Sequence, residues 1–383
     1  MSIVEDRRPP AATARTVAPL ALDTAGVISA AGPGLRPLAD ALRHGAAAGG
    51  RLPAAHDAED YPPLTLRPAD FEAGDLLGTK GLSRLTRAEQ LGMAAATLAL
   101  EPLPDRSGTG LVLGTAVGSS GGIGRFNRDT FVRERPYMVN PSAFPGTLMN
   151  SVAGRTAIRH GLTDANATVS GGPLAFLHAL RFARNALAGG HARRMLSGGV
   201  EELSPHGAWA WHRTGALAPG TALGEGAAVF ALRPLPDGAA GERPLALLMA
   251  VTTGFAAGGP LAAASRLTAC VRDALARSGV AAADVAVVAP GAAGRRGWAA
   301  VERRALRAAL DGPDATGGRH LLCVREVLGE THGASAALQT AAVIARWHDP
   351  HLDTRRERAA LVTSVGPDGS VGCAVLLHPY ADA

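Results

Sequence analysis

Apolar runs of strand length alternate with segments of helical period along most of the chain. "TGLVLGTAVGSSGG" (109–122) is apolar and then glycine-rich, which predicts a buried strand. "SRLTRAEQLGMAAATLAL" (83–100) and "GETHGASAALQTAAVIARW" (329–347) each predict a long helix. Further strands are expected within 18–34, 192–202, 222–234 and 285–289, and a further helix within 175–190. This alternation predicts an α/β fold with mostly buried sheets.

The same succession of strands and helices begins again after "PDGAAGERP" (236–244), which has the composition of a linker. We therefore expect two halves of similar organisation, residues 17–244 and 245–383. Residues 1–16 are polar and contain prolines, so we expect a flexible N-terminal arm there. A chain of 383 residues is long enough to build such a two-part core.

Composition places the chain among globular proteins, with 47% apolar and 19% charged residues. No apolar run approaches the roughly 18 residues that a membrane span needs. The N-terminus carries charges where a signal peptide would be apolar. Cys270, Cys323 and Cys373 lack CxxC spacing, so neither a metal site nor a disulfide framework is indicated. We expect a reduced, soluble, cytoplasmic protein without a membrane partner.

The net charge of +5 is carried almost entirely by arginine, because Lys80 is the only lysine. The arginines are spread along the chain in short pairs such as Arg193–Arg194, without interleaved aromatic residues. This distribution favours solvated helix faces over a nucleic-acid interface. A modest positive field would still steer an acidic protein partner toward the chain.

One short stretch, "ATVSGGPLAFLHAL" (167–180), has the layout of a nucleophile site. A strand-like run is followed by Ser170, two glycines and an apolar segment of helical period. This layout predicts a side chain at a helix N-terminus, where unpaired N–H groups and the helix dipole stabilise an anion. Ser170 is either a reactive residue there or a small side chain that fills space.

Four further stretches, in this order and spacing, resemble the β-ketoacyl synthases of the condensing-enzyme superfamily over nearly the whole chain. They are "PGTLMNSVAGRTAIRHGL" (145–162), "LSGGVEELSP" (196–205), "LGEGAAVFAL" (223–232) and "LGETHGASAALQTAAVIA" (328–345). The resemblance implies a thiolase-like fold of five layers, α-β-α-β-α, built from two pseudo-duplicated halves.

The resemblance also implies that every catalytic position has changed. Ser170 matches the cysteine that accepts the acyl chain, and Pro290 and Glu330 match the two histidines that drive decarboxylation and condensation. Arg325 matches the lysine upstream of the second histidine, and "SVGPDGSVG" (364–372) matches the gate loop. A serine without an adjacent base is a poor nucleophile. His332 lies two positions after Glu330, and on a helix that step would turn its side chain toward a different pocket.

One branch of this family, the chain-length factor of type II polyketide synthases, has lost its catalytic residues and pairs with an active ketosynthase. Its usual residue at the cysteine position is glutamine before a glycine-rich run, whereas this chain has serine in "SGGPLAFLHALRFA". The resemblance implies a heterodimer with a ketosynthase α-subunit and an acyl carrier protein as second partner. Substrates would be carried on the phosphopantetheine arm of that carrier, and no other cofactor is expected.

In such a pair, bulky residues of the β-subunit close the tunnel that holds the growing chain. The resemblance places the interface and tunnel wall in "RFNRDTFVRERPYMVNPSAFPGTLMN" (125–150). The candidate side chains there are Phe126, Phe131, Phe144 and Met149.

Two other functions remain open from the residues. One is a serine-nucleophile acyltransferase of the same fold, which moves an acyl group from acyl carrier protein with Glu330 or His332 as base. The other is a scaffold without enzymatic activity that recruits acyl carrier protein through its arginines.

Overall fold

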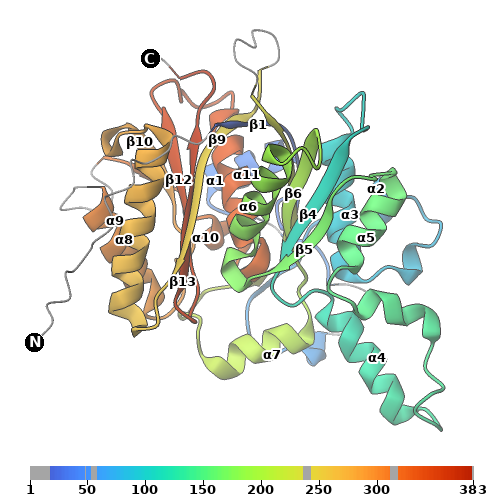
Figure 1. The fold of residues 1–383 in the computed structure, drawn as a ribbon. Coiled ribbons are helices and arrows are strands. Elements are labelled where there is room, and N and C mark those ends of the chain that lie inside the picture. Colours follow the sequence, from blue (N-terminus) through green and yellow to red (C-terminus); the bar gives the residue numbers. More distant parts are fainter. Residues whose placement is uncertain (1–17, 48, 53–57, 236–242, 311–317, 382–383) are drawn as a thin grey trace, which may run out of the picture.

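The computed structural model describes residues 18–381, except 48, 53–57, 236–242 and 311–317 (Figure 1). The expected arm at 1–16 therefore lies outside the described residues. The expected boundary at 244 adjoins such a gap, so the division into two halves stays a prediction.

The first group of strands forms one end of a mixed sheet in the order β1-β8-β6-β4-β5. Their apolar residues are nearly all buried except in β5, which is the last strand at its edge. These strands are β1 (Leu20–Ser29), β4 (Thr109–Thr115), β5 (Asn166–Ser170), β6 (Arg194–Glu201) and β8 (Gly226–Pro234). Both faces of β4 and β6 meet helices, which explains why the two strands are buried along almost their whole length.

The second group continues the sheet in the order β11-β10-β12-β13-β9, and β9 pairs with β1 through residues 20–22. Its strands are β9 (Ala246–Phe255), β10 (Val285–Ala289), β11 (His320–Leu321), β12 (Ala359–Val365) and β13 (Ser370–Leu377). The remaining strands of the described chain are β2 (Gly32–Pro33), β3 (Leu66–Arg67) and β7 (Leu223–Gly224).

Helices cover both groups of strands, and in Figure 1 the layers follow one another from left to right. The outer helices on the left are α8 (Gly259–Ser278) and α9 (Trp298–Ala309), and those on the right are α3 (Arg87–Leu100) and α5 (Ser151–His160). Between the two groups of strands lie α6 (Ala175–Ala188) and α11 (Ser335–Trp347). The remaining helices are α1 (Leu35–His44), α2 (Ala73–Leu77), α4 (Ser120–Val132), α7 (Pro205–Thr214) and α10 (Val324–Leu328). The predicted α-β-α-β-α layering is confirmed.

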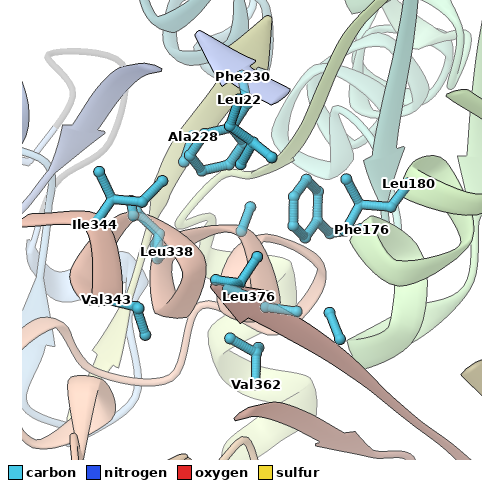
Figure 2. Packing of buried hydrophobic residues seen from close by; sticks show 14 of the residues in the cluster. Leu22, Phe176, Leu180, Ala228, Phe230, Leu338, Val343, Ile344, Val362 and Leu376 are labelled. Carbon is cyan, nitrogen blue, oxygen red and sulfur yellow. The ribbon is translucent and has the colours of Figure 1, made fainter. Parts of the chain in front are cut away.

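The middle layer belongs to the largest cluster of buried apolar residues in the described part of the chain (Figure 2). Phe176 of α6 and Phe230 of β8 are fully buried, with ring centroids 5.6 Å apart. Leu338 and Ile344 of α11 pack in the same cluster, which Val362 of β12 joins from the other group of strands. Because α11 is buried on nearly all sides, its apolar residues are distributed around the helix rather than along one stripe.

Two predicted boundaries differ from the structure for local reasons. The strand expected over 109–122 ends at Thr115, and α4 begins at Ser120. The helix expected over 83–100 begins at Arg87, because Thr86 and Glu89 form a capping box that fixes its start. Within the described ranges, none of the helices combines the length and apolarity that crossing a bilayer requires.

Candidate functional site

Ser170 ends β5, and the predicted strand–turn–helix succession is present around it. Its hydroxyl is exposed and donates to the carbonyl oxygen of Ala116 at 3.1 Å. Gly171 and the short 3-10 helix Gly172–Leu174 separate Ser170 from α6. Four residues therefore separate Ser170 from α6, two more than the pair of glycines in the predicted turn.

Pro290 follows β10 and begins a loop that two buried side chains hold in place. Glu302 accepts hydrogen bonds from the backbone N–H groups of Gly291 and Ala292 at 2.9 and 2.7 Å. Arg325 donates to the carbonyl oxygens of Gly291 and Ala293. The proline ring itself offers no group that can donate or accept a proton at this position.

Glu330 is fully buried between two arginines, both at most 7% exposed. Its carboxylate accepts from Arg295 Nε at 2.7 Å and Nη2 at 2.8 Å, and Arg325 Nε lies 2.9 Å away. The backbone N–H of His332 donates to the same carboxylate at 2.7 Å. Burial alone would raise the pKa of Glu330, but the two guanidinium groups hold it well below its usual range. Glu330 is therefore a fixed anion rather than a proton carrier.

His332 is the one non-glycine residue with positive φ in the described part of the chain, at 43°. It begins the 3-10 helix His332–Ala334, and α11 starts only at Ser335. Its ring lies edge-on against Trp211, with centroids 5.3 Å apart. Burial lowers the pKa of His332 to about 4, so the imidazole is neutral at pH 7.

His332 and Glu330 line one cavity of about 110 Å³ together with Trp211. The prediction that they face different pockets is wrong, because residues 330–334 are not α-helical. A Cβ at position 172 would lie 3.9 Å from His332 Nε2, so the histidine faces Gly172. Among the described residues, neither His332 nor Glu330 hydrogen-bonds the Ser170 hydroxyl.

Sequence reasoning missed Arg295, which contacts Glu330, the Val365 carbonyl oxygen and the Trp211 ring. The available signal was the arginine pair in "GRRG" (294–297), which lies more than 30 positions before Glu330 in the sequence. Glu201 at the end of β6 was missed as well. It accepts from the backbone N–H groups of Ala116, Val117 and Gly333, and burial raises its pKa to about 8.

The hairpin between β12 and β13 occupies the position of the expected gate loop. Pro367 and Asp368 are exposed at its tip, and Asp368 accepts from the backbone N–H of Ser370 at 3.1 Å. Ser364 at its base donates to the carbonyl oxygen of Pro173 at 2.7 Å. The hairpin is thereby tied to the turn that follows Ser170.

Phe126 and Phe131 lie on α4, and Phe144 lies on the 3-10 helix Pro141–Thr147. Met149 lies between that 3-10 helix and α5. The structure brings Phe126 and Phe144 together, with ring centroids 6.0 Å apart. Phe126 lines a groove of about 620 Å³, and Met149 packs on Gly118. Phe131 points away from the body of the chain and is 86% exposed.

This segment carries the largest concentration of exposed apolar side chains among the described residues. We call it the α4 face, and its members are Phe131, Val132, Tyr137, Met138, Phe144, Leu148 and Met149. In Figure 1 it projects from the lower right of the molecule, beyond the layers of the core. An apolar surface of this kind is typical of a protein–protein interface.

Comparison with known proteins assigns the chain to a family. The model of the β-ketoacyl synthase N-terminal domain matches residues 26–238. The 3-oxoacyl-[acyl-carrier-protein] synthase 2 of Vibrio harveyi is 31% identical over 146 residues, which span 35% of this chain and 34% of that protein. The matched part is thus about a third of the curated relative.

Two solved structures are similar over nearly the whole fold. The ishigamide ketosynthase/chain length factor is 32% identical with a TM-score of 0.79, covering 94% of this chain and 99% of that one. The second structure is a type II polyketide synthase acyl-carrier protein in complex with its ketosynthase. The matched chain is 17% identical with a TM-score of 0.77, and the match covers 94% of this chain and 99% of that one. At this identity the similarity shows the fold alone. By its sequence and its fold, this chain belongs to the β-ketoacyl synthase family.

Proposed function

We propose that this chain is a catalytically silent, ketosynthase-like subunit, a chain-length factor that pairs with an active ketosynthase in a type II polyketide synthase. The observation that carries this proposal is the network around Glu330. A condensing site needs a group there that exchanges a proton or stabilises an enolate. Glu330 is instead a buried anion held by Arg295 and Arg325.

The other replaced positions support the same proposal. Pro290 has no side-chain donor, and the Ser170 hydroxyl is hydrogen-bonded to a carbonyl oxygen rather than to a base. The similarity to a ketosynthase/chain length factor over 94% of this chain supports the pairing. The α4 face supplies an apolar surface on which a partner ketosynthase would lie.

Acyl carrier protein is the second partner we propose for the pair. A solved ketosynthase of the same fold binds an acyl-carrier protein of a type II polyketide synthase. The groove beside Phe126 is lined by Arg84, Arg125, Arg128 and Arg133, with Asp129 as its one acid. A positive groove of this kind would attract an acidic carrier. We place the pair in the cytoplasm.

Phe126→Ala is expected to shift the products of the reconstituted pair toward longer chains by at least one two-carbon unit. Phe126 is half-buried against Phe144, so its truncation removes several carbon-sized groups from the apolar contact that would close the tunnel. Mass spectrometry of the products, with a wild-type partner, measures the shift. Phe255→Ala is the matched control, because Phe255 is exposed at the end of β9.

Size-exclusion chromatography must show that the pair remains intact in each variant. If Phe126, Phe131, Phe144 and Met149 can each be changed to alanine with an unchanged product distribution, the length determinant lies elsewhere.

A further inference from the structure

The exposed side of α9 is a stripe of three arginines flanked by two alanines. The exposed positions are Ala300, Arg303, Arg304, Arg307 and Ala308, which recur at the helical spacing of three and four residues. The opposite side of α9, including Val301 and Leu306, is buried. The stripe is therefore presented outward on the last layer of the fold, far from α4 (Figure 1).

A groove of about 790 Å³ runs between this stripe and the N-terminal part of α8. Its apolar side is formed by Pro260, Leu261, Ala264 and Val301, and Leu261 is 67% exposed. Farther along, Thr268 and Arg272 of α8 donate to backbone carbonyl oxygens of α9, which holds the two helices together. The groove thus has a fixed wall on each side.

The three arginines of the stripe have no acidic partner within the described ranges. Asp273 on α8 pairs with Arg277, and the neighbouring Glu302 is buried and bound to the loop after β10. Three unpaired positive charges beside an exposed leucine form a surface that is both basic and apolar.

We propose that the groove between α8 and α9 is a docking site for an acidic amphipathic helix of a partner protein. Carboxylates at successive turns of that helix would pair with Arg303, Arg304 and Arg307, and an apolar residue would cover Leu261. The small side chains of Ala300 and Ala308 allow the backbone of such a helix to approach closely. The apolar wall distinguishes this site from a nucleic-acid surface, which would offer polar and aromatic contacts.

The test measures binding of a fluorescent helical peptide of about 16 residues, with glutamates along one face and leucines beside them. Fluorescence anisotropy is recorded with the full chain at about 50 mM and about 200 mM salt. The triple variant Arg303→Glu, Arg304→Glu and Arg307→Glu is expected to weaken binding at least about tenfold. The matched control is Arg106→Glu, Arg355→Glu and Arg356→Glu, exposed arginines elsewhere, with an expected loss below about threefold.

Leu261→Ser tests the apolar contact independently of the charges. It is expected to weaken binding of the peptide about threefold or more and to leave the salt dependence of binding unchanged. If the charge-reversed triple variant does not fold, Arg303→Gln, Arg304→Gln and Arg307→Gln replaces it. Equal losses in the stripe and control variants would overturn the proposal. So would binding of a DNA duplex or of phosphatidylserine vesicles, but not of the peptide, through the stripe.

Discussion

Glu330→Gln is expected to lower the free energy of unfolding by about 3–5 kcal/mol. The substitution removes the charge that neutralises Arg295 and Arg325, both of which stay buried. Denaturant titration followed by circular dichroism measures the change. Asp273→Asn is the matched control, because its pair with Arg277 is exposed and should contribute less than about 1 kcal/mol.

The pH dependence of the free energy of unfolding gives a second test of the same variant. The pKa of Glu330 is depressed in the folded chain, so its contribution is fully present above the ordinary pKa of a glutamate. This contribution is lost as the pH falls through the pKa that Glu330 has in the folded chain. The difference in free energy of unfolding between wild type and Glu330→Gln should therefore shrink on acidification. If Glu330→Gln lowers the free energy of unfolding as little as Asp273→Asn does at every pH, the structural role of Glu330 is contradicted.

Phe131→Asp is expected to weaken association with the partner ketosynthase by about a hundredfold or more. Phe131 is exposed on the α4 face, so an aspartate there leaves the isolated fold unchanged. In the complex with the ketosynthase, the carboxylate would be buried with no opposite charge beside it. Analytical ultracentrifugation of the mixed subunits measures the dissociation constant. Phe255→Asp, equally apolar and 62% exposed on the other group of strands, is expected to change it less than about threefold.

Melting temperatures of the isolated variants show whether Phe131→Asp remains folded. If Phe131→Asp and Leu148→Asp both associate as the wild type does, the α4 face is not the interface. The partner would then contact another surface, and the tunnel wall would have to be sought there.

The layered fold could be predicted because long apolar runs leave few other solutions. β4 and β6 consist mostly of apolar residues and glycine, and helices on both faces are needed to bury them. The start of α11 could not be predicted, because tertiary contacts fix residues 330–334 in a non-helical form. The buried carboxylate of Glu330 binds the backbone of His332, whose positive φ no local pattern indicates.

The sequence placed candidate positions in the site, but it did not show which side chains pair with one another there. Glu330 and Pro290 were found by their place in the family's motifs, but Arg295 was not, because a motif does not state which distant side chain neutralises a charge. The sequence also did not show which of the candidate tunnel side chains are exposed. Phe126 and Phe131 are five positions apart on α4, and only the packing of Phe144 shows which of them is covered.

The most direct test of catalytic silence is the intact mass of this chain after incubation with an acyl-carrier-protein thioester. The chain is measured alone and paired with its ketosynthase, with Ser170→Ala as control. We predict an unchanged mass for this chain in both cases and an acyl adduct on the partner alone, with the same result for Ser170→Ala. A stoichiometric acyl adduct on the wild-type chain that is absent from Ser170→Ala would contradict the account.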